Sequence, residues 1–228
     1  MMIMDGTSEI VKIEVDRMDV MLEGRLSIPG DDLGIILLLG GSGSLVEQEI
    51  EQTLEKKLLN EGFMVFNTPV LTEKEMKDPG KLIDVDKLRK RIGVLLEWLE
   101  NRKQYSALNF GLVASKSMVE AAIRVSLHEN GRIKAISSIS GHINMRQREL
   151  NQVTPAILLL VGEKNSKIHA LNMFAYQHIP EPRSLEIIKD AGELISDETR
   201  IDEITGKITK WFVQRVKKRV KNRVIIPE

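Results

Sequence analysis

From Gly34 to its end, the chain alternates short segments that are wholly apolar with longer segments whose apolar residues recur every three or four positions. Ile35–Leu39 and Ala156–Val161 are apolar throughout, which is typical of strands buried on both faces of a mostly parallel sheet. Val85–Arg102 carries its leucines on one helical face,. This alternation predicts an α/β fold in which right-handed crossovers place helices on both faces of the sheet.

The same patterns predict the remaining elements. The expected strands are Ser8–Val15, Val20–Ile28, Ile35–Leu39, Phe63–Asn67, Ala107–Val113, Ile133–Ser138, Ala156–Val161 and Ser184–Ile188. The expected helices start at Val46 and stop before Gly62, and then cover Val85–Arg102, Met118–Leu127, Asn165–Tyr176 and Ile201–Val224. Glu73–Pro79 is charged and is followed by Gly80, so we expect a surface loop there. The sequence therefore predicts a single domain over residues 1–228, with a mostly parallel sheet of about seven or eight strands, an antiparallel pair within residues 1–30, and no large lid.

Composition removes several classes of function. Lysine plus arginine total 33 and aspartate plus glutamate total 33, so the net charge does not favour nucleic acid or an anionic membrane as a partner. The absence of cysteine excludes disulfides, thiolate metal sites and a cysteine nucleophile,. No His-x-x-x-His pair is present, and we expect neither a metal nor a cofactor. The apolar runs are far shorter than the roughly 20 residues that span a bilayer, and the first residues are too acidic for a signal peptide. We therefore expect a cytoplasmic protein without a membrane span.

Three turns follow predicted strands, at the carboxyl ends where open α/β sheets place their sites. Gly40–Ser44 is rich in glycine, which lets backbone N–H groups face a cleft as an oxyanion hole requires. Val113–Ser117 joins a strand to an alanine-rich helix, and Ser115 on that turn would project its hydroxyl above the sheet, as in a nucleophile elbow. Val161–Asn165 ends another buried strand, where such folds carry the acid of a catalytic triad.

In their order and spacing, these segments resemble the α/β-hydrolase superfamily, and in particular its dienelactone-hydrolase-like branch. The similarity runs from about Leu22 to Arg215 and includes Gly40–Ser44 and the Ala114-Ser115 pair. The resemblance implies an α/β-hydrolase-like sandwich. It also implies the hydrolysis of small esters or lactones by a serine, a histidine and an acid.

At the triad positions the sequence departs from this family. Ser115 matches the serine, but Val113 and Ser117 replace the two glycines of the elbow. Carried over from the family, the acid position falls on Asn165 and the histidine position falls at about Glu193. An amide can orient an imidazole but cannot stabilise its charged form, and an ordinary glutamate is a weak base for a serine hydroxyl.

No histidine follows His178, so a catalytic base would have to come from elsewhere. Glu193 could act if burial made it a stronger base; a solvated or salt-bridged glutamate is the simpler interpretation. His142 follows a buried strand on the same side as Ser115 and could also reach the cleft, although a hydrogen-bonded loop histidine explains it equally. The backbone groups that would hold an oxyanion belong to Gly41, Ser42 and Lys116.

Residues 216–228 form a basic extension of the last predicted helix. Its cations are Lys217, Lys218, Arg219, Lys221 and Arg223. These cations can simply complement the dipole of the helix at its C-terminus. Alternatively, the extension can serve as a docking surface for a second subunit or another partner, although the lack of interleaved aromatic residues does not favour nucleic acid.

The sequence thus predicts a hydrolase-fold protein that is catalytically impaired or non-catalytic, a pseudoenzyme that keeps the serine and lacks the aspartate and the histidine. One alternative is an active serine hydrolase of small esters or lactones, using Ser115 with a non-standard base. Another is an interaction scaffold that uses the basic C-terminal helix. The expected partners are a small ester or lactone ligand and a second copy of the chain.

Overall fold

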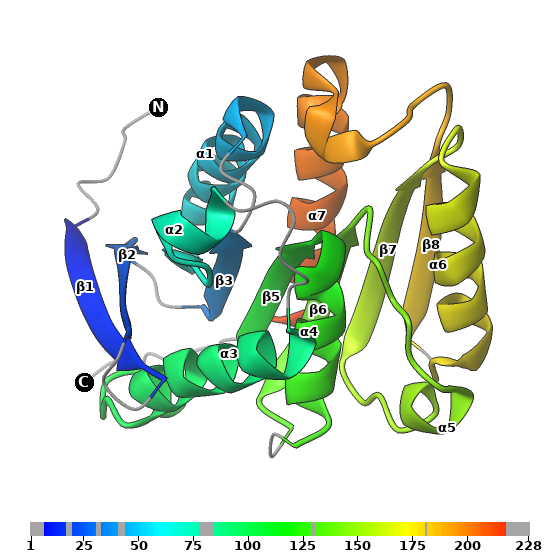
Figure 1. Cartoon of the computed structure of the whole chain (residues 1–228). Coiled ribbons are helices and arrows are strands. Elements are labelled where there is room, and N and C mark those ends of the chain that lie inside the picture. Colours follow the sequence, from blue (N-terminus) through cyan, green and yellow to red (C-terminus); the bar gives the residue numbers. More distant parts are fainter. Residues whose placement is uncertain are drawn as a thin grey trace, which may run out of the picture.

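The structure is a computed structural model, and it describes residues 7–16, 20–30, 33–40, 44–77, 84–128, 131–180 and 182–217. Figure 1 shows a twisted sheet with helices packed on both of its faces. The sheet has eight strands in the order β1-β2-β4-β3-β5-β6-β7-β8. The strands are β1 Thr7–Val15, β2 Val20–Ile28, β3 Ile35–Gly40, β4 Met64–Pro69, β5 Phe110–Ser115, β6 Ile133–Ile139, β7 Ala156–Gly162 and β8 Arg183–Ile188.

Most of the strands run in the same direction. β1 and β2 pair antiparallel, β2 pairs antiparallel with β4, and the pairs from β4 through β3 and β5 to β8 are all parallel. Every residue of β3, β5 and β7 is buried, because both faces of the central sheet are covered. The predicted fold class is therefore confirmed.

The helices divide between the two faces of the sheet (Figure 1). α1 (Leu45–Asn60) and α7 (Ile201–Arg215) pack together over one face, whereas α3 (Val85–Glu100), α4 (Lys116–Ser126) and α6 (Ser166–His178) cover the other. The shorter elements are α2 (Glu73–Met76), α5 (Gln147–Leu150) and 3₁₀ turns at Leu194–Ser196 and Glu198–Arg200. None of the helices in the described ranges is long and apolar enough to cross a membrane.

Successive side chains of a strand point to opposite faces of the sheet, so the core has two layers. On β5, Leu112 and Ala114 belong to the layer under α3 and α4. Val113 belongs to the layer under α1 and α7. Ser115 comes two residues after Val113 and lies on that same side, where it contacts α1.

The main differences from the sequence predictions are in three segments. β5 begins at Phe110, later than expected. The segment expected to be a surface loop holds α2, because its first turn has a capping box: the Thr72 N–H donates to Glu75 Oε2 at 2.9 Å and the Glu75 N–H donates to Thr72 Oγ1 at 3.2 Å,. α7 ends at Arg215, and residues 218–228, most of the predicted basic extension, lie outside the described residues.

Candidate functional site

The turn between β5 and α4 has its strained residue one position later than the sequence suggests. Ser115 ends β5 with an extended backbone (φ −124°, ψ 158°), whereas Lys116, the first residue of α4, has a left-handed φ of 48°. In an α/β-hydrolase the nucleophile occupies the sharp, strained turn between strand and helix. In this chain the strained residue of that turn is Lys116, and its carbonyl accepts a hydrogen bond from the His142 N–H at 3.0 Å.

The Lys116 side chain forms an ion pair with Glu193. Lys116 Nζ lies 3.2 Å from Glu193 Oε1, and the two side chains are 39% and 42% exposed. An ion pair with this much solvent contributes little to stability, up to about 1 kcal/mol. The pair places an ammonium group on the strained turn after β5, bound to the carboxylate at the position carried over for the family's histidine.

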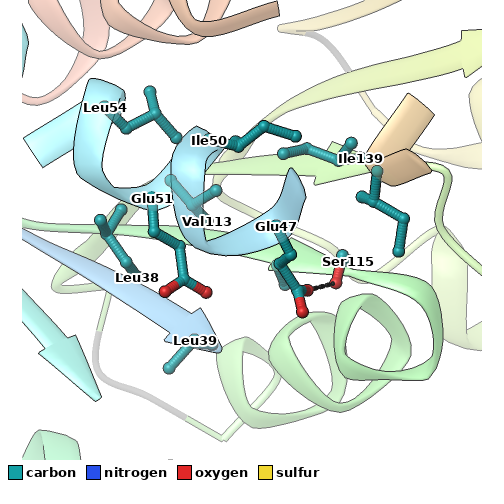
Figure 2. A pocket seen from close by; sticks show the side chains of 11 residues that line it. Leu38, Leu39, Glu47, Ile50, Glu51, Leu54, Val113, Ser115 and Ile139 are labelled. Carbon is teal, nitrogen blue, oxygen red and sulfur yellow. Dashed lines mark hydrogen bonds between the residues drawn. The ribbon is translucent and has the colours of Figure 1, made fainter. Parts of the chain in front are cut away.

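Ser115 lies beneath α1 and not above the sheet, which corrects the expectation for its hydroxyl. The residue is only 8% exposed, and its Oγ donates to Glu47 Oε1 at 2.7 Å (Figure 2). The alternation of side chains along β5 is the reason, since it turns Ser115 toward the same layer as Val113. The two polar groups border a cavity of about 20 Å³ that is otherwise lined mostly by aliphatic side chains of α1 and the neighbouring strands, which is about the space of one water molecule.

Three glutamates lie on the inner side of α1, four residues apart, and sequence reasoning missed them. Glu47 binds Ser115, and Glu55 accepts hydrogen bonds from Arg25 Nη2 and Ser27 Oγ, both at 2.6 Å. Burial, and then the charge of Glu47, raise the pKa of Glu51 to about 7. The helical spacing shared with the buried Ile50 and Leu54 is the signal that could have revealed the row,.

His142 lies on a loop that is fixed at several points. The Ser140 N–H donates to the carbonyl of Leu160 at 2.9 Å, and Asn172 Nδ2 donates to the carbonyl of Gly141 at 2.8 Å. Ser140 Oγ also accepts a hydrogen bond from the N–H of Leu194 at 3.3 Å, which ties this loop to the segment that carries Glu193.

The His142 ring itself is exposed. Its pKa lies below the usual value because of partial desolvation, which the charge of Glu193 opposes and the charges of Lys116 and Lys167 reinforce. Within the described part of the chain, no hydrogen bond joins the ring to Ser115. His142, the candidate base predicted from the sequence, therefore lies near the Lys116–Glu193 pair. The Ser115 hydroxyl instead donates a hydrogen bond to Glu47.

Asn165 follows β7, as the sequence predicts, and serves there as the N-cap of α6. Its Oδ1 accepts a hydrogen bond from the Ile168 N–H at 3.3 Å. A Cβ on Gly162 would lie 1.9 Å from the carbonyl oxygen of Gly192, so the absence of a side chain lets the loop before Glu193 pack against the end of β7. The three positions after β5, β7 and β8 are thus occupied by Lys116, Asn165 and Glu193.

Two further expectations concern ligands of the site. Of the three predicted oxyanion residues, Gly41 and Ser42 lie outside the described residues, and Lys116 is on the turn described above. Among the residues that the structure does describe, there is no group of three or more histidine, aspartate or glutamate side chains able to hold a metal ion.

The strand order and the strained turn after β5 define an α/β-hydrolase fold. Among solved structures, a dienelactone hydrolase from Anabaena variabilis is similar, with a TM-score of 0.82 and 23% identity over 93% of this chain and 99% of that chain. An esterase from Pyrococcus furiosus has a TM-score of 0.73 and 17% identity, over 92% of this chain and 93% of that chain. An esterase domain of a Rhodothermus marinus protein has a TM-score of 0.70 and 14% identity, over 92% and 100% of the two chains.

The comparison with curated sequences adds a different name. A Mycobacterium tuberculosis protein named as a candidate phosphoribosyl transferase is 22% identical over 205 residues, which are 90% of this chain and 46% of that protein. The chain therefore spans about half the length of the curated relatives that it matches. No protein-family model matches the chain.

Proposed function

We propose that this protein keeps the α/β-hydrolase fold without its hydrolytic chemistry, and acts by binding a small ligand or a partner. The observation that carries the proposal is Lys116, which stands on the strained turn after β5 and pairs with Glu193 at 3.2 Å. A serine hydrolase needs at this point a hydroxyl and an imidazole that removes its proton. An ammonium and a carboxylate held together supply neither.

The position of Ser115 supports the same conclusion. A serine nucleophile must reach a substrate carbonyl and lie beside an oxyanion hole. The Ser115 hydroxyl instead donates to a buried carboxylate, next to a cavity of about 20 Å³. Among the described residues, this space holds about one water molecule,. The active hydrolase that uses Ser115 is therefore the weaker of the two candidate functions, and Glu47 is the base that it would require.

A fluorophosphonate probe tests the proposal directly, because it labels activated serines. We expect wild-type protein to remain unlabelled and to hydrolyse short-chain esters no faster than the buffer does. Labelling of the wild type that is lost in Ser115→Ala would contradict the proposal and establish Ser115 as an activated nucleophile.

A triple variant tests whether Lys116, Asn165 and Glu193 occupy the three positions of the catalytic triad. The variant Lys116→Ser, Asn165→Asp, Glu193→His places a serine, an acid and a histidine in the order that α/β-hydrolases use. We expect this variant to react with the probe, and the matched control with Lys116→Ala in place of Lys116→Ser to remain unlabelled. Equal labelling of both variants would show that Lys116 is not the nucleophile position.

A further inference from the structure

A second polar site lies away from the triad positions, where the segment after β6 passes along α4. Four residues line a cavity of about 440 Å³: Arg124, Arg146, Arg148 and Glu149. α5 precedes β7 and lies near the amino ends of the parallel strands, at the bottom of Figure 1. The triad positions are at the carboxyl ends of the same strands, so the two sites are at opposite edges of the sheet.

One arginine of this cavity is held rigidly. Arg124 Nε donates to Glu120 Oε1 at 2.9 Å, and Arg124 Nη1 donates to Glu149 Oε1. Both carboxylates are fixed in turn, because Glu120 Oε2 accepts the Asn144 N–H at 3.0 Å and Glu149 Oε2 accepts the Arg146 N–H at 3.1 Å. The network sets the position of the Arg124 guanidinium and of the backbone that carries the other two arginines.

Arg146 and Arg148, the other two arginines of the cavity, can contact a ligand from solvent. Arg146 and Arg148 are exposed, and among the described residues no carboxylate forms an ion pair with either of them. The lining has three guanidinium groups and one carboxylate. Because Arg124 is paired with both Glu120 and Glu149, the net positive charge comes from Arg146 and Arg148. A cavity of this composition attracts an anion, and its volume is within the range of small-molecule sites, about 300–1,000 Å³.

We propose that this cavity, which we call the arginine cavity, binds a soluble small molecule through a phosphate group. A carboxylate has two oxygens in one plane, which a single guanidinium fork satisfies. A phosphate group has its terminal oxygens arranged tetrahedrally and can accept from donors that approach from different elements, as the arginines of α4 and of the α5 region do. The site is independent of the triad positions and of the function proposed for them.

Titration calorimetry with pyrophosphate at constant ionic strength tests this site. We expect wild-type protein to bind pyrophosphate, and the variant Arg146→Gln, Arg148→Gln to bind at least about tenfold more weakly, because it loses two of the three cations. The matched control is Lys210→Gln, Arg215→Gln, which removes two cations from α7 on the opposite face of the sheet and should bind like the wild type. Circular dichroism and the thermal midpoint verify that all three proteins are folded.

Each remaining outcome would overturn the inference. Equal weakening in both double variants would show attraction by net charge alone, and no binding of pyrophosphate by the wild type would remove the site. Acetate should bind at least about tenfold more weakly than pyrophosphate; equal affinity would contradict the phosphate assignment. Binding to vesicles that contain phosphatidic acid, without any binding of pyrophosphate, would replace the soluble ligand by a lipid surface.

Discussion

Ser115 and Lys116 are neighbours in the sequence but have different surroundings. Ser115 ends β5 and faces α1, while Lys116 turns the chain into α4 with a positive φ. A left-handed backbone costs a residue other than glycine about 1–2 kcal/mol, so the turn has this shape at a cost in stability. The neighbouring Ser115 hydroxyl is buried against α1.

Ser115→Ala is expected to change stability and not activity. The substitution removes a buried hydrogen bond to the carboxylate of Glu47, and a hydrogen bond to a charged group contributes about 1.5–3 kcal/mol. Urea unfolding should show that loss, whereas Ser196→Ala, at an exposed residue, should have no comparable effect. An unchanged free energy of unfolding in Ser115→Ala would mean that the hydrogen bond contributes nothing.

Glu51 makes stability depend on pH near neutrality. Its pKa in the folded protein is about 7, above the ordinary value of 4.5. Below about pH 4.5 the group is protonated whether the chain is folded or unfolded, so the stability is undiminished there. Between about pH 4.5 and 7 the unfolded chain releases the proton and the folded chain keeps it, so stability falls as the pH rises.

Glu51→Gln is therefore expected to stabilise the protein at pH 8 by about 1–3 kcal/mol and to have little effect at pH 4. The amide removes a charge that burial and Glu47 disfavour. Urea unfolding at the two pH values measures the difference, with Glu49→Gln on the exposed side of the same helix as the control. The same change in stability at both pH values would contradict the titration.

At the scale of secondary-structure elements, a buried arginine joins α3 to two other parts of the fold. Arg91 of α3 is fully buried; its Nη2 lies 2.6 Å from Asp16 Oδ2 and its Nη1 lies 2.7 Å from Glu75 Oε2. Asp16 follows β1, and Glu75 belongs to α2. The Arg91 Nη1 also donates to the carbonyl of Val70 at 2.8 Å, so one side chain fixes the hairpin end and the segment that leads into α2.

Arg91→Leu is expected to destabilise the protein by about 1–3 kcal/mol, because it removes charge-assisted hydrogen bonds to two carboxylates that Lys87 also contacts, at 3.6 and 2.7 Å. Arg89→Leu on the same helix removes only a partly exposed pair with Asp86 and should cost less than about 1 kcal/mol. Thermal unfolding of the two variants provides the comparison. If the two variants lost similar amounts of stability, the buried ion pairs of Arg91 would contribute no more than the partly exposed pair of Arg89.

The ion pair between Arg91 and Glu75 makes stability depend on pH in the direction opposite to that of Glu51. The hydrogen bond from Arg91 holds the pKa of Glu75 well below its usual range. The folded-state pKa is lower than the unfolded value, so this stabilisation is present above about pH 4.5 and is lost as the pH falls further.

At the scale of the whole molecule, close packing between the end of β7 and the loop after β8 determines where Glu193 lies in the candidate site. The carbonyl of Gly192 approaches the α-carbon of Gly162, where a Cβ would be 1.9 Å away. The Lys164 N–H donates to the carbonyl of Ala191 at 2.9 Å. These contacts between the end of β7 and the loop after β8 position Glu193 in front of Lys116.

Gly162→Ala is expected to displace that loop and to destabilise the protein by about 1–3 kcal/mol or more, as overpacking does. Gly192→Ala is the matched control, because a Cβ there has no atom within 4 Å. Chemical unfolding measures both, and exchange of the backbone amides of residues 190–194 should increase only in Gly162→Ala. A tolerated Gly162→Ala would mean that the loop moves without cost and does not fix the ion pair.

Most of the fold could be predicted from the sequence, because hydrophobic periodicity is a local property. The apolar run of β3 and the alternation in β1 depend on which residues follow one another, and both strands are found at the expected positions. The segment of α2 was predicted wrongly. Its capping box is visible in Thr72 and Glu75, but the charged composition and the following Pro-Gly favoured a loop.

The sequence by itself determined the succession of strands and helices and the absence of a histidine after His178. The tertiary structure alone decided which residues meet. Lys116 and Glu193 are far apart in the sequence and lie 3.2 Å apart because the segment after β8 packs against the ends of β7 and β6. The Ser115 hydroxyl reaches Glu47 only because α1 packs over the end of β5. Local pattern fixes the direction of each side chain relative to its own strand or helix, whereas its partner depends on how those elements pack.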